Sequence, residues 1–87
     1  MWKSVFIMYT VGLVSKSCLK TYSYSSFEEA NKEFKSWVKI FKLNNVVEHS
    51  TTIIERDTTN SITSVKIIFH VAHDLEYYIM FLAKNKN

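Results

Sequence analysis

β-branched and aromatic residues dominate the start of the chain and occupy both sets of alternate positions of a predicted β-strand. Between residues 3 and 14, one set of alternate positions carries Val5, Ile7, Tyr9, Val11 and Leu13. Phe6 and Met8 make the other side apolar too, which is typical of an inner strand. After a short polar link at 15–17, a second alternating run occupies residues 18–24. The two runs predict a β-hairpin.

The period changes to that of a helix over residues 26–42. Its apolar positions recur every three or four residues and form one stripe: Phe27, Ala30, Phe34, Trp37, Val38 and Phe41. Ser26 is suited to cap the helix, and Glu29 stands where a capping box requires it. Glutamates gather early and lysines late, which matches the helix dipole. We expect the helix to end in the segment "LNN", residues 43–45.

Three further runs predict strands. They cover residues 46–56, 62–72 and 77–83, and they are separated by turn-like polar segments at 57–61 and 73–76. The last run is also compatible with a helix; we interpret it as a strand. The polar tail, residues 84–87, is expected to be frayed.

The order of these elements is β-β-α-β-β-β, which predicts an α+β fold. Short connections favour an antiparallel sheet of four to five strands, with one amphipathic helix packed on one face. A length of 87 residues fits a single small domain, residues 1–87. One helix covers one face of such a sheet, so the other face is left open for contact.

Composition and charge add modest constraints. Hydrophobic residues make up 47% of the chain, enough for a packed core. Cys18 is the single cysteine, which excludes an internal disulfide and favours the cytoplasm.

The apolar start resembles a signal peptide, but we interpret it as a core strand. It is too short to span a bilayer, and no membrane partner is expected. The net charge of +3 favours an anionic partner, although the excess of lysine over arginine also fits an AT-rich genome.

A row of lysines shares one face of the predicted helix. Its members are Lys32, Lys35, Lys39 and Lys42. At 100° per residue, the row lies about 130° around the helix from the apolar stripe. Such a row suits a phosphate backbone or an acidic protein patch, and it is equally typical of a solvated helix face, which we favour.

The open face of the sheet is the second candidate surface. The alternation places Phe6, Met8, Lys66, Ile68 and His70 there, and we expect Lys20, Tyr22 and Tyr24 to join them. Aromatic and lysine side chains on a sheet are suited to single-stranded RNA. An exposed apolar area of this extent also suits a protein partner or a homodimer. We favour a protein interface, because aliphatic side chains stack poorly on bases.

No residue pattern points to catalysis, to a metal or to a cofactor. His70 and His73 are three apart, so on a strand they would face opposite sides. Glu55 and Asp57 form an acidic pair that we interpret as a surface charge cluster. One glycine rules out a glycine-rich phosphate loop. We therefore expect a protein that is not an enzyme, with no catalytic residues, no metal ligands and no cofactor.

The layout of the first half of the chain resembles the small early proteins of T-even phages that inhibit host functions, including antagonists of toxin–antitoxin ribonucleases. The resemblance lies in the immediate strand "MWKSVFIMYT", the second strand and the helix "SFEEANKEFKSW". It implies a non-catalytic inhibitor that binds a bacterial toxin or defence enzyme in the host cytoplasm, with RNA as a further partner. The rival interpretation is a protein that binds single-stranded RNA or DNA directly.

Overall fold

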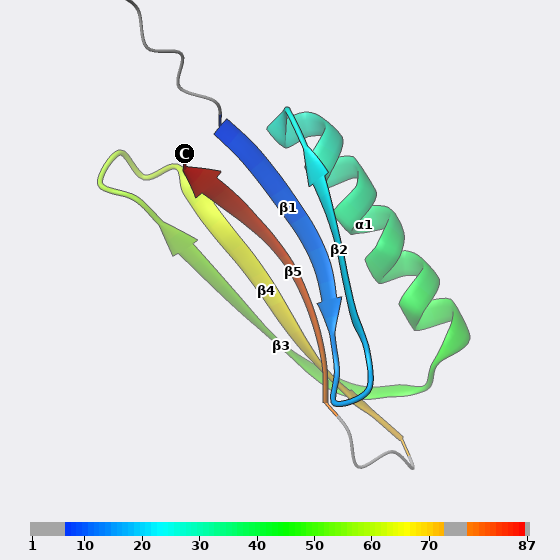
Figure 1. Cartoon of the computed structure of the whole chain (residues 1–87). Helices are drawn as coiled ribbons and strands as arrows, with labels where there is room; N and C mark the ends of the chain where they lie inside the picture. Colours follow the sequence, from blue (N-terminus) through cyan, green and yellow to red (C-terminus); the bar gives the residue numbers. More distant parts are fainter. Residues whose placement is uncertain (1–6, 73–76, 87) are drawn as a thin grey trace, which may run out of the picture.

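The computed structural model describes residues 7–72 and 77–86. In these ranges the elements follow the predicted order: β1 (Ile7–Val14), β2 (Leu19–Tyr24), α1 (Phe27–Asn44), β3 (Val47–Arg56), β4 (Ile62–Val71) and β5 (Tyr77–Lys86). The predicted α+β class is confirmed, and the last run is a strand (Figure 1). No helix in the described ranges combines the length and apolarity needed to cross a membrane.

The strands form one antiparallel sheet in the order β2-β1-β5-β4-β3 (Figure 1). β5, the last strand in sequence, lies between β1 and β4, where Leu82 pairs with Val11 on one side and with Val65 on the other. The sheet therefore joins an N-terminal hairpin to a C-terminal three-stranded meander. Its two edges are β2 and β3.

The ends of α1 are held by side chains close in sequence. The Glu29 N–H donates to Ser26 Oγ at 3.2 Å, as the predicted cap requires. At the other end, the amides of Asn44 and Asn45 donate to the carbonyl oxygens of Ile40 and Phe41 at 2.9 and 3.0 Å. These bonds satisfy backbone groups that have no partner inside a helix.

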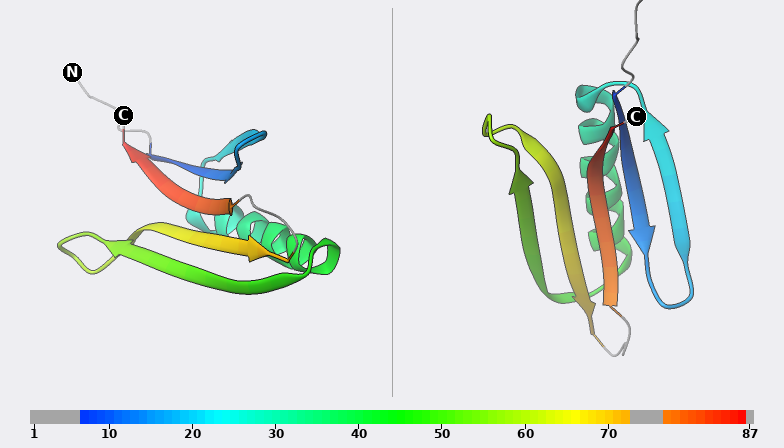
Figure 2. Two further views of the ribbon diagram at one scale, coloured as in Figure 1. Left: turned by 90° about the horizontal axis from the view of Figure 1, so that it is seen from below. Right: turned by 60° about the vertical axis from the view of Figure 1, so that its left-hand side comes forward.

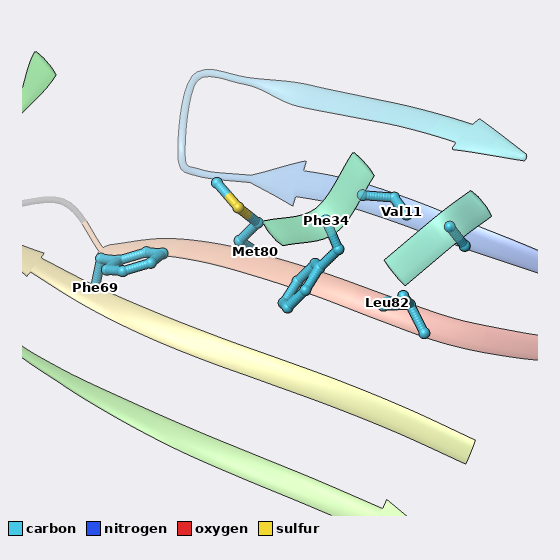
Figure 3. Packing of buried hydrophobic residues seen from close by; sticks show 6 residues of the cluster. Val11, Phe34, Phe69, Met80 and Leu82 are labelled. Atoms are coloured by element: carbon cyan, nitrogen blue, oxygen red, sulfur yellow. The ribbon is translucent and has the colours of Figure 1, made fainter. Parts of the chain in front are cut away.

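The core lies between α1 and the central strands. Its buried members are Val11, Ala30, Phe34, Phe69, Met80 and Leu82 (Figure 3). At the C-terminal half of the helix, Phe41 stacks on Phe69 with ring centroids 4.7 Å apart. Towards its start, Phe27 meets Tyr9 edge to face at 5.7 Å. The whole predicted stripe of α1 thus packs on the sheet.

The β3–β4 hairpin extends past the helix, and its turn end projects clear of it (Figure 2). Every residue of β3 is exposed except Val47, which is half-buried. The turn is closed by Asp57, whose N–H donates to the Ser61 carbonyl oxygen at 3.0 Å. Asn60 takes the left-handed backbone conformation, with φ 68°, which asparagine tolerates well.

The expectation of a frayed tail is wrong for residues 84–86. β5 continues through Lys86, because the start of β1 offers a partner strand, with Met8 opposite Asn85. The Asn85 side-chain amide also donates to Thr10 Oγ1. Pairing along β1 therefore orders a segment whose polar composition predicts a loose end.

Candidate interaction surfaces

Among the described residues, no helix or strand covers the face of the sheet opposite α1, and apolar side chains cross its middle (Figure 2). Val11 and Leu82 point to the helix side, so alternate residues of their strands point the other way. The register then aligns Leu19, Val14, Ile79 and Ile68 in one row across β2, β1, β5 and β4. The neighbouring row aligns Thr21, Gly12, Phe81, Lys66 and Ile53. We call these two rows the bare face.

Phe81 lies flat across Gly12 at the centre of the bare face. A Cβ atom built on Gly12 would stand 2.3 Å from Phe81 Cζ, closer than such atoms can approach. The ring thus fills the space that a side chain on β1 would occupy, and it is half-buried as a result. A glycine that admits an aromatic ring from the next strand is a recognised way to stabilise a sheet. A shallow hollow beside the ring is lined by Val14, Lys66, Ile79 and Phe81.

The structure divides the residues expected on this face into two groups. Lys66, Ile68, His70 and Met8 lie on the face away from the helix, whereas Phe6 falls outside the described residues. The placement of Lys20, Tyr22 and Tyr24 on the open face is wrong. They stand opposite Leu13, Val11 and Tyr9, and therefore share the helix side of the sheet with these residues.

Lys20, Tyr22 and Tyr24 instead line a groove between β2 and α1. It is open to solvent, has a volume of about 490 Å³, and has Trp37, Ile40 and Met80 in its wall. Tyr22 meets Trp37 edge to face, with ring centroids 5.3 Å apart. Partial desolvation, followed by the negative charges of Glu33 and Glu29, raises the pKa of Tyr24.

The lysine row lies on the far side of the molecule from the bare face. Lys32, Lys35, Lys39 and Lys42 are all exposed. The helix turns its apolar stripe to the sheet, so the row points outward, on the flank away from the groove that Trp37 and Ile40 line. A compact partner on the bare face does not reach the row, because α1 and the sheet lie between them.

A cluster of rings stands at one end of the sheet, on the same side as the bare face. His49 and His70 are directly opposite on β3 and β4 and stack with centroids 3.9 Å apart. Tyr77 meets His70 edge to face at 4.5 Å. Sequence reasoning missed this cluster, because the pairing of His49 with His70 depends on the β3–β4 register. His73 lies outside the described residues, so its predicted orientation is not tested.

The described residues contain no group of three or more metal-ligating side chains. The acidic pair predicted as a surface cluster divides into two separate contacts. Glu55 accepts a hydrogen bond from Ser64 Oγ at 3.1 Å, whereas Asp57 accepts three in its own turn, from Thr59 Oγ1, Thr59 N–H and Ser61 N–H at 2.6, 2.8 and 3.1 Å. The bond from Thr59 Oγ1 is the main cause that lowers the pKa of Asp57. Both carboxylates have structural partners.

No protein-family model matches the chain, and neither the curated proteins nor the solved structures yield a significant match. A function for this chain is therefore argued from its own surfaces.

Proposed function

We propose that this chain is a non-catalytic inhibitor that binds a bacterial host protein, such as a toxin ribonuclease, and blocks it by covering its surface. The bare face is the contact area. The proposal of a host target in the bacterial cytoplasm rests on the resemblance of residues 1–37 to the early proteins of T-even phages. The proposal of a protein contact rests on the bare face itself.

The supporting observation is the apolar centre of the bare face and its exposed margin. Phe81, Ile79, Ile68 and Val14 are half-buried within one chain, so part of each side chain is exposed on this face. At the margins, Leu19 is 72% exposed and Ile53 is 44% exposed. A contiguous exposed apolar patch on a small protein is typical of an interaction site, and its fully desolvated centre would supply most of the binding free energy.

The position of the lysine row changes the expected mechanism. A partner that used both surfaces would have to contact the bare face and the lysine row together. The row points away from the bare face, which leaves Lys66 as the lysine within it. Binding through the bare face should therefore depend weakly on salt, because apolar contacts are not screened by ions.

A second candidate function is direct binding of single-stranded RNA or DNA. The observation that favours it is the cluster of His49, His70 and Tyr77, whose rings could stack with bases, beside the bare face with Lys66. Nucleic-acid binding weakens steeply with salt, because bound cations are released from the phosphates. Salt dependence therefore separates the two candidates.

The test uses two matched leucines, one on the bare face and one on α1. Leu19 is 72% exposed and Leu43 is 76% exposed, so neither substitution disturbs the core. Tagged wild-type protein, Leu19→Glu and Leu43→Glu would each be used to capture partners from a bacterial lysate, with and without RNase and at low and high salt. The captured protein would then be purified and its affinity for each variant measured by titration calorimetry.

We expect Leu19→Glu to weaken the purified interaction about thirtyfold, which corresponds to about 2 kcal/mol, because the substitution places a charge where an apolar contact is expected. Leu43→Glu should bind as the wild type does. Capture that disappears with RNase, or that falls steeply with salt, would instead support the nucleic-acid candidate. Equal loss in both variants would contradict a contact through the bare face.

A further inference from the structure

The outer edge of β3 over residues 49–54 lacks the features that usually keep sheet edges from pairing. The strand has ten residues, and its register shifts lie near its ends, at Val47/His49 and Glu55/Arg56. The chain contains no proline, and β3 contains no lysine. Short length, lysine, proline and central bulges are the common protections of edge strands. The other edge, β2, has six residues and carries Lys20.

The backbone groups available along this edge belong to Ser50, Thr52 and Ile54. The Glu55 carbonyl oxygen accepts from Thr63 Oγ1 at 3.2 Å, and the Asp57 N–H donates to Ser61 at 3.0 Å, so both odd-numbered positions turn their backbone groups toward β4. Backbone groups of an antiparallel strand alternate in direction. The even-numbered residues of the unbulged segment therefore direct their N–H and C=O groups outward.

The sequence of β3 is complementary to itself around Thr52. When a second copy of β3 is laid antiparallel with Thr52 opposite Thr52, the regular segment 49–55 pairs along its whole length and His49 faces Glu55. The His49–Glu55 pair occurs twice because of the two-fold symmetry. A shift of two residues in either direction, which is the smallest that keeps the faces matched, separates His49 from Glu55 and leaves residues of the regular segment without a regular partner. The extent of regular pairing therefore selects one register.

The hydrogen bond that Glu55 makes within its own chain leaves it able to pair. Glu55 accepts from Ser64 Oγ through Oε1, and its other oxygen can face a partner.

We propose that β3 pairs with β3 of a second copy of this chain, antiparallel and centred on Thr52. The product is a closed two-fold dimer with one continuous sheet of ten strands, twice the five of one chain. A two-fold axis perpendicular to the sheet keeps both helices on one side and both bare faces on the other. The dimer therefore presents two adjoining bare faces to a partner, a step beyond the function proposed above.

Sedimentation of the full-length chain over a range of concentrations tests this proposal. The wild type should pass from 10.2 kDa to twice that mass as concentration rises. Thr52→Lys places two like charges together at the two-fold axis and should weaken the dimer at least tenfold. Thr21→Lys is the matched control, because Thr21 is an exposed threonine within the other edge strand. It should dimerise as the wild type does.

A wild type that stays at 10.2 kDa at every concentration would overturn the proposal, as would a Thr52→Lys variant that dimerises normally. A species whose mass rises above that of the dimer as concentration increases would overturn the closed arrangement. If circular dichroism shows that Thr52→Lys is unfolded, charge reversal decides instead. His49→Glu and Glu55→Lys should each weaken the dimer, and the double variant should restore it; a double variant no better than the singles would overturn the register.

The proposed dimer and the proposed inhibitor function can be contradicted independently of each other. Leu19 lies on the far edge strand from β3, so Leu19→Glu should leave sedimentation unchanged whether or not it abolishes binding of the host protein. A chain that is monomeric and still loses its partner through Leu19→Glu would retain the proposed function without the dimer.

Discussion

The part of the sheet under α1 and the β3–β4 hairpin belong to one antiparallel ladder, yet they differ in what holds them. Val11 on β1 and Leu82 on β5 are 0% and 1% exposed, whereas Ile54, on the same helix side of β3, is 50% exposed. All three are branched aliphatic residues in regular strands. The difference comes from the reach of one helix, which packs on the strands near the centre and leaves β3 beyond its edge (Figure 2).

This difference indicates that stability is unevenly distributed. Apolar burial supplies most of the free energy of folding, and it is concentrated between α1 and the strands β1, β4 and β5. β3 depends on its hydrogen-bonded pairing with β4 and on the turn that Asp57 holds. Strands with few buried contacts open at lower free energy than the core does. An edge that opens or pairs easily is also the part best suited to accept a second chain.

The largest expected effect is on the covered side. Phe34 on α1 is 5% exposed, and Phe34→Ala should lower the free energy of unfolding by about 3–5 kcal/mol, because it leaves a cavity under the helix. Ile54→Ala, on the helix side of β3, should cost less than about 1 kcal/mol, since half of that side chain is already in water. Chemical denaturation measures both. Equal losses of unfolding free energy in the two variants would contradict the uneven distribution of stability.

A smaller effect is expected on the bare face of the same central strands. Gly12→Ala drives a methyl group into the Phe81 ring and should destabilise by about 1–3 kcal/mol, despite the usual gain from replacing glycine in a strand. In a Phe81→Leu background the same substitution should cost much less. Denaturation of the four proteins in this cycle gives the coupling. A coupling free energy of zero between the two substitutions would mean that the packing of the Phe81 ring does not depend on Gly12.

The smallest effect is expected at the turn of the exposed hairpin. Hydrogen bonds to its carboxylate hold the pKa of Asp57 below its ordinary value of 3.8. Asp57 therefore contributes to stability at pH values above 3.8, and this contribution is lost as pH falls through the lower folded-state pKa. Amide exchange at Ser61 should be faster in Asp57→Asn than in the wild type at neutral pH, and the difference should shrink in acid. A difference that persists at low pH would contradict this role.

Local patterns predicted much of this fold. Ser26 and Glu29 marked the start of the helix, and the structure has the hydrogen bond between them. The helical spacing of Ala30 and Phe34 identified two of the six buried core residues. The alternation of Val65, Ile67 and Phe69 indicated which side of β4 packs inward. Each of these features depends on residues that are neighbours in sequence.

Contacts between distant segments were not predictable in the same way. Alternation showed that Lys20, Tyr22 and Tyr24 share one side of β2, but not which side, because both sides of that strand carry polar residues. The side is set by the pairing of Tyr22 with Val11 and by the contact of the Tyr22 ring with Trp37. The insertion of β5 between β1 and β4 likewise depends on pairing across the whole chain, and so does the stacking of His49 on His70.

The fit of Phe81 over Gly12 also constrains how this sequence can change over time. A substitution of Gly12 alone places a side chain against the Phe81 ring. Loss of the Phe81 ring alone leaves the backbone at Gly12 without a covering side chain. In any descendant that keeps this sheet, the glycine and the large ring should be inherited together, or be exchanged together for a side chain on β1 and a small residue on β5. The pair would serve as a sequence marker for this architecture when diverged relatives are compared.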